Sequence, residues 1–96
     1  MLNNKQKSYL KSLANKEKAV FQIGKDGLSD NMIQGISNGL KANELLKFTV
    51  LKTCPVDIRE IAFDLAAATN SEVVQIIGRT AVLYRHNPEG KIHLPK

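Results

Sequence analysis

The strongest constraint on the fold is a strand–helix–strand unit between residues 19 and 51. Residues 19–23 (AVFQI) are short, apolar and β-like, and the glycine-bounded segment 24–27 (GKDG) then turns the chain. An apolar stripe at helical spacing ends near Asn43, and residues 45–51 alternate as a strand does. Such units favour a right-handed crossover and a parallel strand pair. The unit therefore predicts a sheet with a helix packed across it.

The rest of the chain supplies two more helices and a hairpin. Residues 4–14 and 57–68 carry apolar side chains at helical spacing. Residues 72–77 and 80–84 are strand-like and surround Gly78-Arg79, which is typical of a tight antiparallel hairpin. The order of elements is therefore α-β-α-β-α-β-β.

These elements fit one domain over residues 1–96. The chain is long enough for a single core, and no repeat or linker divides it. The fold class is a compact α/β domain with a mixed four-stranded sheet packed with helices. The order of the strands stays open. Residues 86–96 could form a loosely ordered tail, with a short strand near Ile92 as the alternative.

Glycines and aromatic residues refine the expected packing. Gly35 and Gly39 weaken their helix, but their spacing would permit close packing on the sheet. Phe21, Phe48 and Phe63 are expected in the core, because the sequence has no RRM-type aromatic signature that would stack bases on an open sheet.

No catalytic or metal site is expected. The two histidines fall in the polar C-terminal segment, and Cys54 is better explained as a small packed residue at a helix start than as a nucleophile. Asp57, Glu60 and Asp64 share a helix side, which is usually a solvated face. No metal-ligand spacing or phosphate-binding glycine motif appears, so we expect no cofactor and no small-molecule substrate.

The chain is basic, and its charge is uneven. Fourteen Lys and Arg residues against nine Asp and Glu residues give a formal net charge of +5, and the sequence pI is about 9.5. The excess lies in residues 1–28 and 79–96, whereas residues 29–78 are slightly acidic. This charge is compatible with nucleic-acid binding, although solubility alone would also explain it. No apolar run is long enough to span a membrane and no signal-peptide pattern is present, so a cytoplasmic protein is expected.

The glycine-bounded segment is the most informative motif. Gly24 and Gly27 would let the backbone approach another chain closely, and Lys25 adds a positive charge. The helix start after Ser29 favours an anion, so the loop suits a sugar-phosphate backbone. Taken on its own, the loop is better explained as an ordinary strand-to-helix turn, and only the surrounding basic residues favour RNA contact. Asp26 argues slightly against phosphate unless it points away or caps the loop.

Further basic residues could extend a positive surface around this loop. If the two basic ends of the chain converge on the loop, they form one continuous surface for a polyanion. Tyr84 beside Arg85 could stack on a base, or it could cover the core. The candidates for RNA contact are Lys7, Lys11, Lys18, Arg79 and Arg85, together with Gly24, Lys25, Asp26 and Gly27.

Three stretches, KQKSYLKSLA, VFQIGKDGLSDNMI and SEVVQIIGRTAVLYR, followed by a closing KIHLPK, carry a family resemblance. From about Leu2 to Lys96 the chain resembles the stand-alone bacterial YhbY-type proteins of the CRM family (chloroplast RNA splicing and ribosome maturation). The resemblance implies a fold similar to the C-terminal domain of translation initiation factor three. It implies RNA contact by the GxxG loop, Gly24 to Gly27. Bacterial members are associated with precursors of the large ribosomal subunit.

The expected function is a non-catalytic RNA-binding protein that binds ribosomal RNA or pre-ribosomal particles during large (50S) subunit assembly. One alternative is a protein–protein adaptor that docks on a ribosomal protein or assembly factor. Another is a small enzyme acting on RNA through Asp57, Glu60 and Asp64. DNA binding is less favoured, because no helix-turn-helix or basic-zipper pattern is present.

Overall fold

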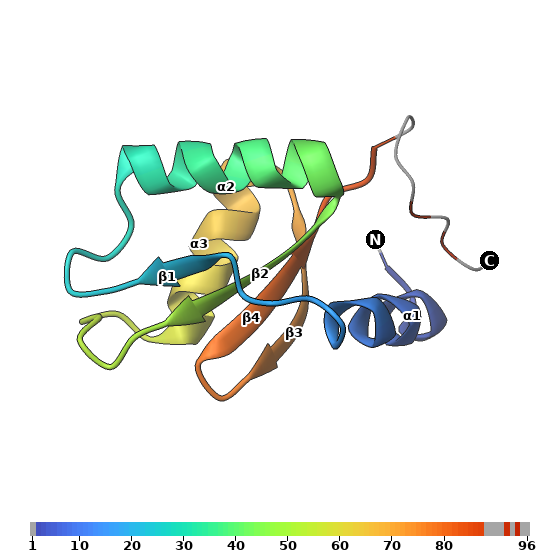
Figure 1. Ribbon diagram of the computed structural model, residues 1–96, viewed down its shortest axis with the longest axis horizontal. Helices are drawn as coiled ribbons and strands as arrows, with labels where there is room; N and C mark the ends of the chain where they lie inside the picture. Colours follow the sequence, from blue (N-terminus) through green and yellow to red (C-terminus); the bar gives the residue numbers. More distant parts are fainter. Residues whose placement is uncertain (1, 88–91, 93, 95–96) are drawn as a thin grey trace.

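A mixed four-stranded sheet in the order β1-β2-β4-β3 forms the centre of the molecule (Figure 1). The structure, a computed structural model, describes residues 2–87, 92 and 94. The strands are β1 (Phe21–Ile23), β2 (Leu45–Val50), β3 (Glu72–Ile77) and β4 (Thr80–Tyr84). β1 and β2 are parallel, and the other two pairings are antiparallel. The expected mixed sheet and hairpin are confirmed, and β4 lies between β2 and β3.

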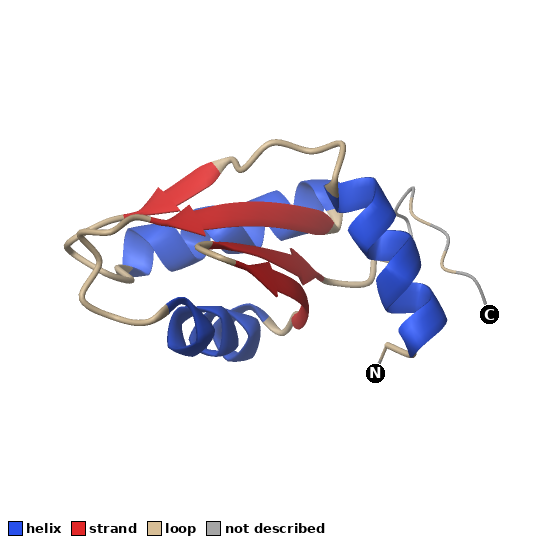
Figure 2. Ribbon diagram, turned by 90° about the horizontal axis from the view of Figure 1, so that it is seen from below, coloured by secondary structure: helices blue, strands red, loops and turns tan. Residues whose placement is uncertain are grey.

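Two helices cover one face of this sheet, and the third packs on the opposite face. The helices are α1 (Asn4–Ala14), α2 (Asp30–Asn43) and α3 (Ile58–Thr69). The main core lies between the sheet and the pair α2 and α3, where Phe48 is fully buried. A second cluster joins Leu10 of α1 to Val82 and Tyr84 on the other face. α1 therefore covers only one end of that face, at the right of Figure 2.

Two glycines allow α2 to lie close to the sheet. A Cβ atom added at Gly39 would stand 2.7 Å from Cδ1 of Leu46, and one at Gly35 would stand 3.2 Å from the ring of Phe21. The expected close packing is confirmed. The apolar surface that this contact buries offsets the low helix propensity of glycine.

The positions of the aromatic residues correct one expectation. Phe48 is buried and Phe21 packs against the core, as expected. Phe63 is 59% exposed, so its assignment to the core is wrong. The buried stripe of α3 runs through Ile61 and Leu65. Phe63 is two residues from each of them, which is about 200° around the helix, so its side chain points to solvent. Tyr84 is only 3% exposed.

A bulge interrupts the outer strand β3. Its register with β4 shifts between Val73 and Gln75, so that Val73 packs in the main core while Val74 packs in the cluster beside α1. Gln75 pairs with Val82, whose side chain also lies on the α1 face. The bulge thus places two successive side chains, Val74 and Gln75, on one face of the sheet.

Parts of the C-terminal segment pack on the domain. Ile92 and Leu94 contact the cluster beside α1, and the Ile92 N–H donates to Oε1 of Glu44 at 3.2 Å. Neither residue belongs to a strand. The other residues of the expected tail beyond Asn87, which include Lys91 and His93, lie outside the described residues. Among the helices of the described chain, none is long and apolar enough to cross a membrane.

Candidate nucleic-acid interface

Three connecting segments meet at one end of the sheet, at the left of Figure 1. They are the glycine loop (residues 24–29), the segment from β2 to α3 (residues 51–57) and the β3–β4 hairpin. The Leu51 N–H donates to the Ile23 carbonyl oxygen at 2.8 Å, and the Val50 N–H donates to the Arg79 carbonyl oxygen at 2.7 Å. These backbone hydrogen bonds hold the three segments side by side.

The glycine loop is a tight turn in which the two glycines have different roles. The Gly27 N–H donates to the Gly24 carbonyl oxygen at 3.0 Å, which closes the turn. Gly27 has φ +64°, a left-handed conformation that favours glycine, and a Cβ atom there would meet nothing within 4 Å. A Cβ atom at Gly24 would make ordinary contacts, 3.5 Å from Oγ1 of Thr53. Only Gly27 is therefore required by backbone conformation.

The start of α2 is a weaker anion site than the sequence suggests. Ser29 caps the helix as expected, and its Oγ accepts a hydrogen bond from the Met32 N–H at 3.1 Å. That donor is therefore occupied, and Asp30 adds a negative charge in the first turn. The Asp26 carboxylate is exposed and accepts no hydrogen bond from any described residue, so it does not cap the loop. Attraction of an anion to this end must come mainly from side-chain cations.

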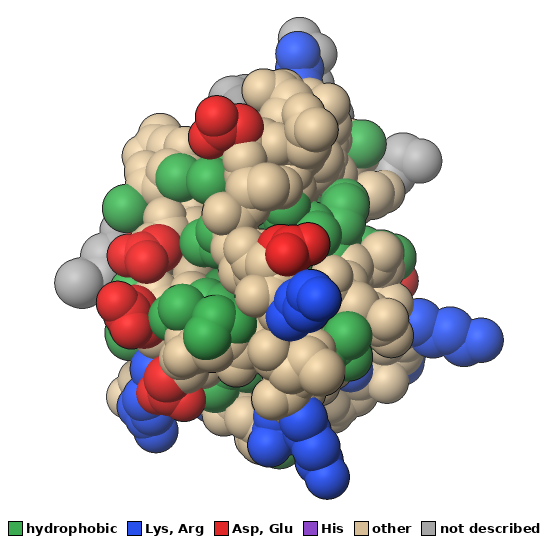
Figure 3. Space-filling view, turned by 90° about the vertical axis from the view of Figure 1, so that its left-hand side faces the viewer, with side chains coloured by type: hydrophobic (Ala, Val, Ile, Leu, Met, Phe, Trp, Pro, Cys, Tyr) green, Lys and Arg blue, Asp and Glu red, His purple; other side chains and the backbone are tan. Residues whose placement is uncertain are grey.

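Three exposed cations lie on the three segments, namely Lys25, Lys52 and Arg79. A recess of about 520 Å³ between residues 51–57 and the hairpin is lined by Lys52 and Arg79, with Asp57 as the single acidic residue. In the end-on view of Figure 3, most Lys and Arg side chains lie in the lower half and at the right-hand edge, whereas acidic side chains gather mainly on the left.

Sequence reasoning missed Lys52. The strand–helix–strand unit could have placed Lys52 beside the glycine loop, because parallel strands joined by one crossover end at the same edge of the sheet. Ile23 and Val50 are register partners, so the residues that follow them must be neighbours.

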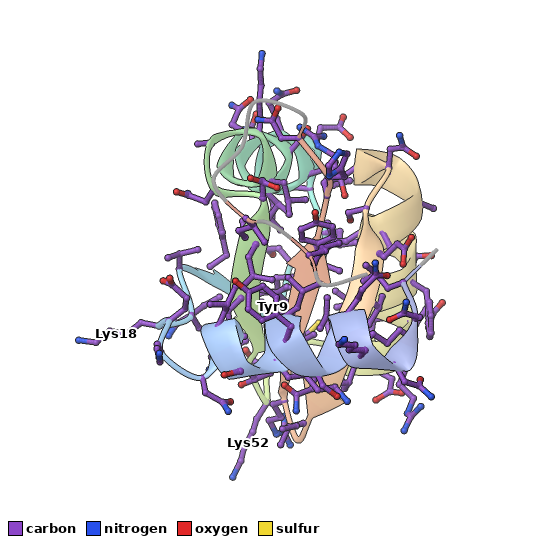
Figure 4. The ribbon with its side chains drawn as sticks, turned by 90° about the vertical axis from the view of Figure 1, so that its right-hand side faces the viewer. Tyr9, Lys18 and Lys52 are labelled. Carbon is purple, nitrogen blue, oxygen red and sulfur yellow. The ribbon has the colours of Figure 1, made fainter. Side chains whose placement is uncertain are left out.

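The other basic candidates lie elsewhere. Lys7 and Lys11 are on α1, at the far end of the molecule from the glycine loop (Figure 1), and both are half-buried. Lys18 precedes β1, and its side chain projects away from the body of the molecule (Figure 4). The expectation that both basic ends converge on the glycine loop is therefore wrong for α1.

Arg85 has a structural environment. Its guanidinium donates to the Thr69 carbonyl oxygen at 3.1 Å and to the Ser37 carbonyl oxygen and hydroxyl at 3.4 Å each. It thus joins α2 to the end of α3. These bonds satisfy much of its donor capacity within the protein.

Tyr84 covers the core and does not offer a free ring. Burial raises its pKa above the usual value, and the nearby carboxylate of Glu44 raises it further. Its hydroxyl lies 3.3 Å from Nδ1 of His86. The expectation of a base-stacking Tyr84 is wrong, and the core-covering alternative is confirmed.

Residues considered for catalysis have ordinary surroundings. Cys54 is half-buried and packs against the main core before α3, which confirms its interpretation as a packed residue. Asp57, the N-cap residue before α3, and Glu60 and Asp64 within the helix are all exposed. Within the described residues, no group of three His, Cys, Asp or Glu side chains could hold a metal ion.

Comparison with known proteins identifies relatives over nearly the whole chain. The CRS1/YhbY (CRM) domain matches residues 2–85. The "Probable RNA-binding protein YqeI" of Bacillus subtilis is 45% identical over 96 residues, which cover 99% of this chain and 100% of the relative. An "RNA-binding protein" of Haemophilus influenzae is 36% identical over 95 residues, 99% of this chain and 96% of the relative.

A solved structure has the same fold. The solution structure of the hypothetical protein SAV1595 from Staphylococcus aureus is 48% identical and superposes with a TM-score of 0.83. The match covers 99% of this chain and 100% of the Staphylococcus aureus chain. The α/β fold described above is therefore shared with an experimentally determined structure. The likeness to the C-terminal domain of translation initiation factor three stays a prediction.

Proposed function

The chain belongs to the CRS1/YhbY (CRM) domain family, and from this premise we propose that it binds RNA through the glycine loop and the cations beside it. Relatives named as RNA-binding proteins that match nearly end to end support this proposal. The single observation that carries the location is the meeting of Lys25, Lys52 and Arg79 on three adjacent segments.

The chemistry of this end suits a sugar-phosphate backbone. Gly24 and Gly27 carry no side chain at the two ends of the turn, so a phosphate can approach the backbone closely there. Lys25, Lys52 and Arg79 supply charge that releases counterions from RNA on binding. Asp26 lies at the tip among them, and we propose that it remains in solvent when phosphates bind.

The remaining candidates have separate parts in this proposal. Lys18 extends the positive surface along the side of the sheet. Lys7 and Lys11 would reach a different part of a large RNA, because α1 lies at the other end of the molecule. Arg85 would act indirectly, by joining α2 to α3.

We further propose that the RNA is ribosomal and that binding is non-catalytic, at a stage of large (50S) subunit assembly in the cytoplasm. The resemblance of this chain to bacterial family members that are associated with large-subunit precursors supports a ribosomal RNA target. The packing of Cys54 against the main core and the solvent exposure of the carboxylates at and in α3 support non-catalytic binding.

Charge reversal tests the proposed location. The variant Lys25→Glu/Lys52→Glu should lose most of its affinity for ribosomal RNA in a filter-binding assay. Lys41→Glu/Arg59→Glu is the matched control, because it makes the same change in net charge at exposed positions on α2 and α3. Equal losses in the two variants would contradict a localised site.

One observation favours the adaptor as a second candidate function. Phe63 is 59% exposed on α3, beside the carboxylates of Glu60 and Asp64. An exposed aromatic ring with carboxylates nearby suits a basic protein segment, whereas the carboxylates repel the phosphates of RNA. An adaptor should retain its protein partner after ribonuclease treatment and lose it on Phe63→Ser substitution. Release of every partner by ribonuclease would exclude this candidate.

A further inference from the structure

The face of the sheet opposite α2 and α3 is only partly covered. α1 packs over Val82 and Tyr84, and beyond it the face carries no helix in the described chain (Figure 2). Across this open part, Gln22 of β1 pairs with Thr49 of β2, and Thr49 pairs with Thr80 of β4. The two threonine hydroxyls lie 3.3 Å apart. The polar side chains of Gln22, Thr49 and Thr80 thus form a row across the open part of the face.

A hollow of about 220 Å³ lies where this surface meets the end of α1. Its lining residues, which include no carboxylate, are Asn15, Lys47, Gln75, Ile77, Thr80 and Val82. Gln75 lines the hollow because the bulge in β3 places it on this face together with Val74. Bulges that redirect a side chain in this way are common next to functional sites.

The side chains that line the hollow can recognise the edge of a nucleobase. The amides of Asn15 and Gln75 each offer donors and an acceptor, and neither amide makes a hydrogen bond to any residue in the described part of the chain. Ile77 is 62% exposed and supplies an apolar surface. Unpaired RNA bases are recognised by this combination of edge hydrogen bonds and apolar contact.

The charge around the hollow favours a nucleic-acid strand over a basic protein segment. Nζ of Lys47 donates to the carbonyl oxygens of Ala14 and Glu17 at 3.4 Å each, and a lysine ammonium has a third donor to offer. Lys18 and Lys52 project from two sides of the molecule, to the left and downward in Figure 4. A strand that crosses the open face would meet these cations.

We infer that the hollow binds one unpaired base of an RNA strand whose phosphates lie beside Lys18, Lys47 and Lys52. The inference rests on the proposed function, because it requires that the protein binds RNA. It adds a second site on the sheet, distinct from the glycine loop. The glycine loop would contact paired and unpaired RNA alike, whereas the hollow would accept only a base that is free of a duplex.

A nuclear magnetic resonance titration separates the two sites. The probes are oligouridylate, oligoadenylate and oligocytidylate single strands and a blunt-ended RNA duplex with the same number of phosphates. The side-chain amide signals of Asn15 and Gln75 should shift with at least one single strand and stay in place with the duplex. Signals of Gly24 and Gly27 should shift with both kinds of RNA.

The outcomes of this titration are distinguishable. If the glycine signals shift while both amides stay in place with every single strand, the inference is wrong and the proposed function stands. If no RNA shifts any signal, the proposed function fails and the inference fails with it.

Substitutions in the hollow provide a second measurement. Gln75→Ala/Ile77→Ala should weaken binding of the preferred single strand roughly 10-fold, the scale of one base contact, and leave duplex binding unchanged. Gln22→Ala is the matched control, because Gln22 is exposed on the same open face outside the hollow. Thermal unfolding checks that both variants are folded. Equal loss for the single strand and the duplex, or no loss for either, would overturn the inference.

Discussion

Lys25 and Lys52 occupy equivalent positions in the fold, each two residues beyond a strand end. The strand ends are Ile23 and Val50, which are register partners in the parallel pair of β1 and β2. The backbone hydrogen bond from Leu51 to Ile23 keeps the two following segments together. The proposed RNA contact therefore depends on strand pairing as much as on the glycine loop, and the two cations should act together.

The salt dependence of RNA affinity should show how many of these two lysines contact phosphate. Replacing Lys25 and Lys52 together with Gln should reduce the slope of log affinity against log salt concentration by about two, because each lysine that contacts a phosphate contributes about one. Affinities for one ribosomal RNA fragment at several salt concentrations provide the measurement. An unchanged slope would show that neither lysine contacts phosphate.

The two glycines of the loop should respond differently to alanine. Gly27→Ala should lower the free energy of unfolding by roughly 1–2 kcal/mol, because φ +64° is strained for a residue with a Cβ atom. Gly24→Ala, the matched control, should change it by less than about 0.5 kcal/mol. Urea denaturation measures both. Bulkier side chains at both positions should weaken RNA binding while unfolding stays cooperative, and full affinity in such a double variant would exclude the loop from the interface.

The contact between Gly39 and Leu46 should appear as energetic coupling. Gly39→Ala should destabilise the protein by about 1–3 kcal/mol despite its better helix propensity, since the new Cβ atom would stand 2.7 Å from Cδ1 of Leu46. In a Leu46→Val background the cost should be smaller, because valine has no Cδ atom. Additive effects in this double-mutant cycle would mean that the clash is relieved in another way.

The two arginines should separate stability from binding. Arg85→Ala should lower the free energy of unfolding by about 1–3 kcal/mol, because it removes hydrogen bonds to Thr69 and Ser37. Arg79→Ala, at an exposed hairpin position, should leave stability nearly unchanged and weaken RNA binding. Urea denaturation and RNA titration of both variants test this. Loss of RNA affinity in a fully folded Arg85→Ala protein would place Arg85 in the interface.

Stability should fall in alkaline solution through Tyr84. Burial in the folded state raises the pKa of Tyr84, so folding favours the protonated phenol. The contribution of this phenol to the free energy of unfolding is intact below about pH 10, the usual pKa of tyrosine. The contribution is lost as the pH rises from the unfolded pKa through the folded one. Tyr84→Phe should therefore make unfolding free energy less dependent on pH in this range. An equal pH dependence in the two proteins would assign the effect to other groups.

The helices and strands could be predicted from the sequence because their signals are local. The caps and periodicities, such as Ser29 before α2, act within one or two turns of the chain. The surroundings of Arg85 could not be predicted, because its hydrogen bonds to Ser37 join residues 48 positions apart. The site was predicted only in part for the same reason. The glycine loop is a local motif, whereas Lys52 joins it only through the pairing of β1 with β2, and the position of α1 relative to the loop is set by packing on the sheet.

The bulge between Val73 and Gln75 also affects how copies of this protein meet. β3 is an outer strand of the sheet, and an outer strand with regular backbone spacing can add a strand from a neighbouring molecule. The bulge breaks that spacing, and the other outer strand, β1, is only 3 residues long. Both edges are therefore poor templates for adding a strand from a neighbouring molecule, although part of the sheet face is uncovered.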